Sequence, residues 1–292
     1  METDKIASKY LGKKVDGSKN YEPSLLVGIP RAENRIQYGI ENVNLPFEGW
    51  DVWHVYEFSS MSEKGVPVTR LLKLKYDCRS EFLVESKSLK LYMNSFNMTG
   101  FGENTTECLE ICKDIIERDL SNVLHTEVKA NFIDTVNRVE IFSDFQDLMQ
   151  YVDENTLRIE NFKEAPEVLD IEQGELKEYY LTFDSLRSNC RVTHQPDFGD
   201  VFIYYKSTKH IKEDSLLKYL CSFRSEYHFH EECCEMIYKR LYDILEGGEL
   251  FVCALYTRRG GIDICPVRWN TKIQNADKLL DIMQFARYGV KQ

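Results

Sequence analysis

A cysteine and an aspartate lie close together in the sequence SNCRVTHQPDFGDVFIYY, which spans Ser188 to Tyr205. Cys190 precedes several turn-forming residues and is outside any amphipathic pattern, which favours a reactive thiol whose protonation a group such as His194 could tune. A buried structural cysteine is the commoner fate of this residue type, and Asp197 alone would more often be a turn or cap residue. Because Asp197 accompanies the thiol, we interpret Cys190 as a catalytic candidate.

A second dense group of polar residues is YHFHEECCE, Tyr227 to Glu235. Two histidines, several acids and two cysteines suggest zinc, but the paired spacing of common zinc sites is missing and the cysteines are adjacent. His230 and Glu231 start the predicted helix, where they can face a site, while Cys233 and Cys234 turn towards the packed side. A carboxylate that stabilises the helix N-terminus explains the fragment about equally well.

Two further motifs carry positive charge. In ESKSLKLY, Glu85 to Tyr92, a spacing of three puts Lys87 and Lys90 on one helix face, where they could hold an anion such as a cofactor phosphate. The segment TRRGG, Thr257 to Gly261, offers two guanidinium groups and a backbone that a ligand can approach closely. Solvated lysines and a surface hairpin are the ordinary alternatives.

Common nucleotide motifs are missing from the sequence. Gly100 and Gly102 stand between two helical patterns and not after a strand of a βαβ unit, so they do not form a Rossmann fingerprint. No P-loop and no H-E-x-x-H motif occurs. The sequence therefore disfavours a Rossmann site.

The composition restricts the class of protein further. The chain has 292 residues, 43% hydrophobic and 29% charged, which is typical of folded globular proteins. A net charge of −11 disfavours a nucleic-acid surface and favours a small-molecule partner. The start METDKIASKY lacks a signal-peptide pattern and the longest apolar stretch, Leu250 to Tyr256, is too short to span a membrane, so we expect a cytoplasmic protein. Its nine cysteines should be mostly reduced thiols.

An internal repeat predicts the elements that must position these residues. SLKLYMNSF (Ser88 to Phe96) and SLLKYLCSF (Ser215 to Phe223) match at five of nine positions with an offset of 127. Each copy is followed by a second helical pattern. The chain therefore reads as two similar modules in tandem, which we assign to residues 1–150 and 151–292, with the acidic stretch from Asp153 to Glu178 as the linker region.

Strand patterns surround both helix pairs. The predicted strands are Asp51 to Met61, Arg70 to Cys78, Glu127 to Thr135 and Val139 to Ser143 in the first module, and Glu178 to Leu186, Asp200 to Lys206, Leu250 to Tyr256 and Ile262 to Trp269 in the second. Each module thus reads ββααββ, an α+β unit with an antiparallel sheet and two helices on one face. Such a sheet has open edges, so lateral association of modules is expected.

Four motifs together resemble the NADPH-dependent 7-cyano-7-deazaguanine reductases, the QueF nitrile reductases of queuosine biosynthesis. They are ESKSLKLY in the first module and SNCRVTHQPDFG, FHEEC and YTRRGGIDICP in the second. The resemblance runs from YEPSLLVGIPR through NLPFEGWDVWHVYE to PVRWN, and it matches the long, two-module form. It implies the tunnelling fold (T-fold), in which tandem ββααββ modules associate into barrels. Arg191 departs from the family pattern, since a proline or an apolar residue is more usual after the cysteine.

The resemblance implies a reaction for the opening motif. Cys190 would attack the nitrile carbon of the deazapurine (preQ0) to give a covalent thioimide, and Asp197 would protonate the nitrile nitrogen. One NADPH would deliver hydride to this adduct, the thiolate would leave, and a second NADPH would reduce the imine to the amine (preQ1). Two cofactors would thus be consumed per turnover, and the resemblance implies no metal.

It also implies the binding residues. Glu231 and Glu85 would accept N–H groups of the guanine-like edge, and His230 would line the pocket and assist proton transfer. The substrate contacts would include the segment Val84, Glu85, Ser86. The residues implied for NADPH are Ser86, Lys87, Arg259 and Gly260, with Lys90 as a weaker candidate.

Because these motifs come from different modules, each site is expected where modules meet, and a homodimer is the expected working state. Cys233 follows Glu231 by two positions, and we hypothesise that it forms a protective disulfide with Cys190 under oxidation. Two other functions remain open: a zinc-dependent, pterin-type cyclohydrolase of the same fold family, and a non-catalytic purine-binding module in which Cys190 is incidental.

Overall fold

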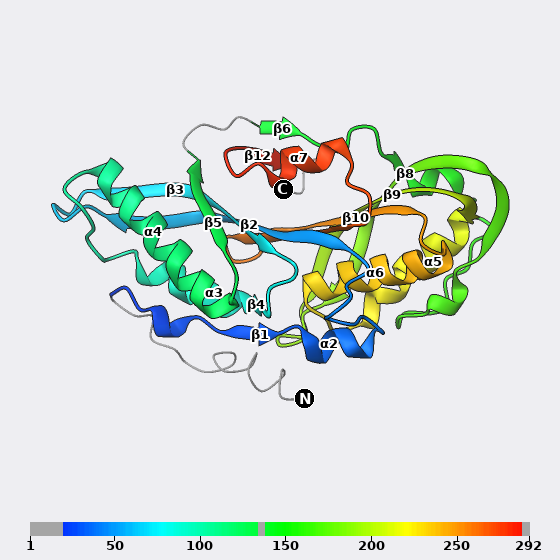
Figure 1. Cartoon of the computed structure of the whole chain (residues 1–292), viewed down its shortest axis with the longest axis horizontal. Coiled ribbons are helices and arrows are strands. Elements are labelled where there is room, and N and C mark those ends of the chain that lie inside the picture. The colour runs from blue at the N-terminus through cyan, green and yellow to red at the C-terminus, as the bar shows by residue number, and fades with distance from the viewer. Residues whose placement is uncertain (1–19, 134–137, 288–292) are drawn as a thin grey trace.

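The computed structural model describes residues 20–133 and 138–287. Its centre is an eight-stranded sheet with the order β5-β3-β2-β11-β10-β9-β8-β7 (Figure 1). Neighbouring strands are antiparallel, except that β7 and β8 are parallel. Its strands are β2 (Glu48–Met61), β3 (Pro67–Asp77), β5 (Val128–Ile133), β7 (Gln146–Asp147), β8 (Ile171–Asn189), β9 (Pro196–Ile211), β10 (Glu249–Tyr256) and β11 (Ile262–Trp269).

Two small sheets accompany the large one. β1 (Gly28–Pro30) pairs with β4 (Phe82–Val84) in antiparallel fashion, and β6 (Arg138–Glu140) pairs in parallel with β12 (Phe285–Arg287). In Figure 1 the first lies on the helical side of the large sheet and the second on the opposite side.

The four longest helices lie on one side of the sheet, and the C-terminal helix lies on the other (Figure 1). The four are α3 (Ser86–Ser95), α4 (Thr105–Leu124), α5 (Glu213–Ser222) and α6 (His230–Ile244); the remaining helices are α2 (Ala32–Gln37), α7 (Gln274–Leu280) and the 3-10 turns Pro23–Leu25, Leu148–Tyr151, Pro166–Val168 and Phe223–Ser225. No helix in the described ranges has the length and apolar character needed to cross a membrane.

Strand periodicity explains why both faces are covered. Successive side chains of a strand point to opposite faces: Trp53 packs in the core beneath α3 and α4, whereas its neighbour Val52 packs with Leu279 of α7 on the other face. All of Leu250–Tyr256 in β10 is buried. A strand covered on both faces is apolar throughout, which explains the apolar run found in the sequence.

The second half has the predicted ββααββ order, from β8 to β11. It joins the first half through β2 and β11, which pair from Glu48↔Trp269 to Val55↔Ile262. One continuous sheet therefore unites elements that are more than two hundred residues apart in the chain. The division at residues 150 and 151 stays a prediction.

The fourth strand predicted for the first half, Val139 to Ser143, is confirmed only at its start, by β6 (Arg138–Glu140), and it does not join the large sheet. β6 ends at Glu140 and pairs with β12 in a separate small sheet, so it adds no strand to the large sheet. This half contributes β5, β3 and β2 to one end of the large sheet and the two-residue strand β7 to the other. The physical reason is burial: Ile141 and Phe142 are almost fully buried, and Phe142 stacks on Phe202 with ring centroids 4.5 Å apart. The segment covers the sheet face instead of extending the sheet. The end of the strand predicted to reach Thr135 lies outside the described residues.

Two boundaries also differ from prediction. β8 begins at Ile171, inside the expected linker, and β9 begins at Pro196 instead of Asp200. As a result Asp197 belongs to a strand and not to a loop, and its position is set by the pairing Ser188↔Asp197.

Candidate active site

Cys190 lies in the turn that connects β8 to β9, just after the last strand pair, Asn189↔Pro196. Its backbone N–H donates to the carbonyl of Gln195 at 2.8 Å, and the N–H of His194 donates to the Cys190 carbonyl at 2.9 Å. His194 has a φ of 59°, a strained left-handed conformation for a residue with a side chain. These contacts hold the turn in one conformation.

The environment of the Cys190 sulfur differs from that of the other thiols. Cys190 is partly exposed, whereas the other eight cysteines are buried. The backbone N–H of Thr193 donates a hydrogen bond to Cys190 Sγ at 3.5 Å. Burial raises the pKa of thiols such as Cys233, to about 12, so the exposed thiol is the one best suited to nucleophilic chemistry.

Asp197 lies between the side chains of Arg259 and His230 and is only 6% exposed. Its Oδ1 is 2.9 Å from Nη1 of Arg259, and its Oδ2 is 3.6 Å from Nε2 of His230. The ring of His230 also packs edge-on against Tyr256, with centroids 4.1 Å apart. Strand β9, the hairpin after β10 and the start of α6 thus converge on one carboxylate.

Glu231 is the second residue of α6 and is 2% exposed. Its Oε1 has no hydrogen-bond partner among the described residues. Burial, and next the negative charge of Asp51, raise the pKa of Glu231 to about 8. Buried acceptors are normally paired, so this oxygen is suited to a ligand that brings N–H donors.

Glu85 has a clear local role as the N-cap of α3. Its carboxylate accepts the backbone N–H groups of Lys87 at 2.9 Å and of Ser88 at 2.6 Å. The preceding residue, Val84, donates its N–H to the hydroxyl of Tyr76 at 3.4 Å. Burial raises the pKa of Glu85. The cap fixes the segment from Val84 to Ser86 where strand β4 becomes helix α3.

The first-half motif reaches the second-half site within one chain. Leu83 of β4 and Glu231 line the same small cavity. Lys90 lies against the hairpin: a Cβ on Gly260 would be 3.3 Å from Cε of Lys90. Burial, and next the charge of Arg259, lower the pKa of Lys90. Lys87 is exposed, so Lys90, the weaker candidate from sequence, is the lysine that lies beside Gly260.

The hairpin that carries Arg259 depends on its two glycines. Gly260 and Gly261 have φ values of 60° and 75°, and the N–H of Arg259 donates to Ile262 O at 3.0 Å. Two successive positive φ angles are required by the tight turn that suits a twisted hairpin. The turn therefore presents Arg259 towards Asp197.

Sequence reasoning missed a buried charge network that lies next to Glu231. Glu235 accepts from Nη2 of Arg268 at 2.8 Å and from Nη2 of Arg35 at 2.7 Å, and Arg268 also lies 2.8 Å from Asp51. Burial would raise the pKa of Glu235, but the guanidinium groups of Arg35 and Arg268 lower it to about 2. The members come from β2, α2, α6 and β11, so no local pattern indicates them.

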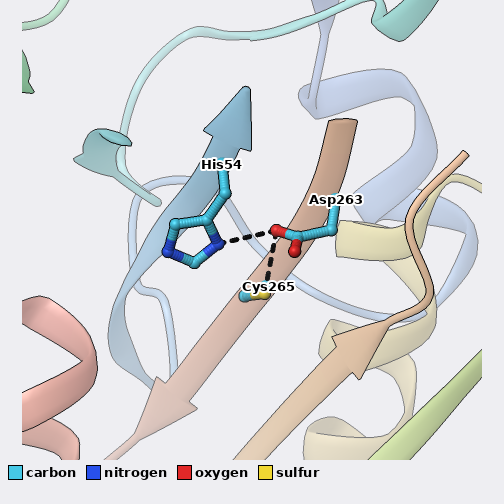
Figure 2. A group of neighbouring side chains, drawn as sticks. All are labelled: His54, Asp263 and Cys265. Atoms are coloured by element: carbon cyan, nitrogen blue, oxygen red, sulfur yellow. Dashed lines mark hydrogen bonds and ion pairs between the residues drawn. The ribbon is translucent and has the colours of Figure 1, made fainter. Parts of the chain in front are cut away.

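A second cluster of chemically capable residues lies on the sheet face opposite α6. Figure 2 shows His54, Asp263 and Cys265, whose ligand atoms lie within 4.8 Å of one another. His54 Nδ1 is 2.7 Å from Asp263 Oδ1, Cys265 Sγ is 3.6 Å from the same oxygen, and Tyr56 donates to Oδ2 at 2.5 Å. Both carboxylate oxygens are therefore occupied, and the cluster is a hydrogen-bonded chain that joins β2 to β11.

Comparison with known proteins connects this geometry to a family. Residues 18–132 match the family model described as nitrile reductase, 7-cyano-7-deazaguanine-reductase N-term, and residues 196–275 match that of QueF-like proteins. A curated relative named NADPH-dependent 7-cyano-7-deazaguanine reductase, from Colwellia psychrerythraea, is 39% identical over 264 residues, which cover 88% of this chain and 90% of the relative. Relatives of the same name from Rickettsia bellii and Rickettsia felis are each 38% identical, over 90% and 91% of this chain and 93% and 94% of their own lengths.

Proposed function

The chain belongs to the family of NADPH-dependent 7-cyano-7-deazaguanine reductases, and from this we propose that it reduces 7-cyano-7-deazaguanine to 7-aminomethyl-7-deazaguanine in queuosine biosynthesis. The observation that carries the proposal is the pairing Ser188↔Asp197 at the base of the Cys190 turn, which brings the segment of the partly exposed thiol beside a buried acid. Glu231, whose Oε1 has no hydrogen-bond partner among the described residues, follows His230, which lies 3.6 Å from Asp197. A nitrile reductase needs these three groups for attack, proton transfer and recognition of the base.

In the proposed first step the Cys190 sulfur forms a bond to the nitrile carbon while one π bond of the C≡N group breaks. The nitrile nitrogen takes a proton from Asp197, and Asp197 can in turn receive the proton that the thiol loses. The product is a neutral thioimide on Cys190. His230, 3.6 Å from Asp197, is suited to assist this transfer.

NADPH supplies a hydride to the carbon in each of the two reductive steps. After the first, the C–S bond breaks and Cys190 leaves as a thiolate. The overall balance is one nitrile, two NADPH and two protons to one primary amine and two NADP⁺. The role of this chain is to hold the carbon in place and to move protons at Asp197.

Recognition of the base is assigned to Glu231 together with the Val84, Glu85 and Ser86 segment. A carboxylate that accepts two parallel N–H bonds discriminates strongly against bases without those donors. The unpartnered Oε1 of Glu231 supports this role. Since both oxygens of Glu85 already accept backbone N–H groups, Glu85 would use remaining lone pairs or act by holding the segment.

The cofactor phosphates are assigned to a group of donors around the hairpin and the start of α3, namely Ser86, Lys87, Lys90, Arg259 and Gly260. In a chain with a net charge of −11, a local concentration of cations is suited to an anionic ligand. The backbone at Gly260 has no side chain to block close approach.

Several finer features belong to the same proposal. We assign the halves 1–150 and 151–292 to tandem T-fold modules that act as a cytoplasmic homodimer without a metal. Among the described residues β5 pairs with β3 on one side only, and such an open edge favours pairing with a second copy. The two motifs already meet within one chain, so the dimer is argued from this edge and not from the need to complete a site.

The experiment is to incubate the protein with the nitrile without NADPH and to measure its intact mass. We expect a gain equal to the ligand's mass at Cys190, no gain in Cys190→Ala, and an unchanged gain in the control Cys221→Ala, which removes a buried thiol. With NADPH added, two cofactors should be oxidised per amine formed. A non-catalytic purine-binding module would bind without any mass gain, and a zinc cyclohydrolase would lose activity with a chelator.

A further inference from the structure

Arg191, the residue after the nucleophile, has a partly buried side chain that reaches two other elements. Its Nη1 lies 2.8 Å from Asn34 Oδ1 in α2, and 3.2 Å and 3.4 Å from the two carboxylate oxygens of Glu232 in α6. The side chains of Arg191 and Glu232 are only 11% and 5% exposed. Removing one partner of an ion pair so shielded from water leaves a buried charge unpaired, which costs far more than breaking a surface pair.

Glu232 is the residue through which α6 is anchored. Its Oε2 accepts the backbone N–H of the N-cap residue Phe229 at 3.1 Å, which is the half of a capping box that the third helical residue supplies. Asn34 donates to its Oε1, and His228 Nδ1 lies 3.5 Å from its Oε2. The residues between the cap and Glu232 are His230 and Glu231, so Glu232 sets where these two site residues lie.

The residues directly before and after Cys190 are therefore both held by contacts with other elements. On one side, Asn189 donates its N–H to Glu226 O at 2.8 Å and accepts from His228 N–H at 3.1 Å. On the other side, Arg191 is paired with Glu232. Three residues after Arg191 the same turn includes the left-handed residue His194, whose strain has to be balanced by contacts elsewhere.

We propose that Arg191 is a positioning residue, which locks the turn of Cys190 to the N-terminal turn of α6 through its ion pair with Glu232. The distance between the sulfur and a base held by Glu231 then depends on this pair. This inference rests on the proposed nitrile reductase function, and it goes beyond it by assigning a role to a residue that the family pattern does not explain. In this proposal Arg191 acts through the ion pair with Glu232 and not on the substrate or the cofactor.

The role follows from how sensitive bond formation is to placement. A displacement of about 1 Å can cost about a hundredfold in rate, whereas binding of the base through Glu231 does not require the sulfur. Loss of the pair should therefore slow attack on the nitrile and leave its non-covalent affinity almost unchanged. Substitution of a residue that only stabilises the fold would lower both the rate of attack and the affinity, or change neither of them.

The test measures the rate of thioimide formation from the growth of the adduct mass, and the non-covalent affinity for the nitrile in a Cys190→Ala background. For Arg191→Leu we expect adduct formation to slow about 10- to 100-fold, with affinity within about twofold of the parent. Arg191→Lys keeps the charge without the planar fork and should restore part of the rate. The matched control is Lys239→Met, which removes another ion pair of α6, with Asp243, and should keep the parent rate.

Two further variants, Glu232→Gln and the double variant Arg191→Leu/Glu232→Gln, distinguish a loss of positioning from a general loss of folded protein. Glutamine can still cap Phe229 but cannot form the ion pair, so this single variant should be slowed like Arg191→Leu. The double variant leaves no unpaired buried charge and should be no slower than the worse single variant, because both changes break one interaction.

Three outcomes would overturn the inference: an adduct rate for Arg191→Leu within twofold of wild type, equal losses in rate and in affinity, or additive losses in the double variant. Failure of the proposed function would look different, because the wild-type protein itself would then gain no mass with the nitrile.

Discussion

The guanidinium of Arg259 lies 2.9 Å from the carboxylate of Asp197 and joins the hairpin after β10 to the start of β9. The pair connects a residue assigned to the cofactor with the residue assigned to proton transfer. Lys90 lies beside the same hairpin. A phosphate bound there would compete with Asp197 for Arg259, so binding of the cofactor would change the environment of the acid.

Arg259→Ala should weaken NADPH binding and preserve the covalent step. Loss of one charge-assisted hydrogen bond costs about 1.5–3 kcal/mol, so we expect the KM for NADPH to rise about 10- to 100-fold. Adduct formation with the nitrile alone should persist. The control is Arg258→Ala, because Arg258 is exposed and lies over the Tyr56 ring. An unchanged KM for NADPH in Arg259→Ala would remove Arg259 from the cofactor site.

Asp197→Asn should block chemistry and not binding. A positioned acid contributes roughly 10²- to 10⁴-fold to a proton-transfer step, so adduct formation should slow by about that factor. The affinity for the nitrile, measured with Cys190→Ala as the parent, should stay the same. Asp184→Asn, at an exposed position of β8, is the control. Equal losses of rate and affinity would show that Asp197 only holds the pocket together.

The affinity for the nitrile should depend on pH through Glu231. Burial raises the pKa of this carboxyl to about 8, so below that pH it is mostly protonated and must lose a proton before it can accept two N–H bonds. Affinity should therefore rise about tenfold per pH unit up to about pH 8 and level off above it. Calorimetry on Cys190→Ala at pH 6 to 9 measures this effect. Glu231→Gln should flatten the profile, and a flat profile with Glu231 intact would contradict the prediction.

Glu235→Gln should lower the free energy of unfolding. The substitution leaves Arg35 and Arg268 buried beside a neutral amide, and breaking such a pair costs about 3–5 kcal/mol. Since the pKa of Glu235 is lowered to about 2, its stabilisation is present at neutral pH and is lost as the pH falls from about 4.5 to about 2. The difference in unfolding free energy between wild type and variant should shrink over that range.

Urea titrations at pH 7 and pH 3 measure this difference. Asp243→Asn, which removes a half-exposed partner of Lys239 on the same helix, should change stability by less than about 1 kcal/mol. If the difference in unfolding free energy between wild type and Glu235→Gln were the same at both pH values, Glu235 would not act through its charge.

Cys190 and Cys233 should form a disulfide slowly after exposure to peroxide. Peroxide converts the Cys190 thiolate to a sulfenic acid, and the Cys233 thiol then displaces water to form the S–S bond. Burial raises the pKa of Cys233 to about 12, so little thiolate is present at pH 7 and closure should be faster at higher pH. The measurement is protection of Cys190 from irreversible oxidation. Equal protection in Cys233→Ala would exclude the disulfide.

The sequence alone predicted much of the architecture and the candidate site. Hydrophobic periodicity and the repeat at an offset of 127 indicated the tandem helix pairs and the ββααββ order that is observed in the second half. These features are local, since the spacing of apolar side chains along one element decides which element forms. The residue types around Cys190 and Asp197 were equally readable, because they lie within one short segment.

Only the tertiary structure decided which distant residues meet. Segment Val139 to Ser143 reads as a strand, yet Phe142 is held on the sheet face by Phe202. Nothing local distinguishes Lys90 from Lys87, but the hairpin of Gly260 lies against Lys90. The partners Arg191 and Glu232, and likewise the charges around Glu235, come from separate elements. A side chain's partners depend on how the layers of helices and sheet pack and on which charges are buried together. The spacing of residues along the chain does not predict these contacts.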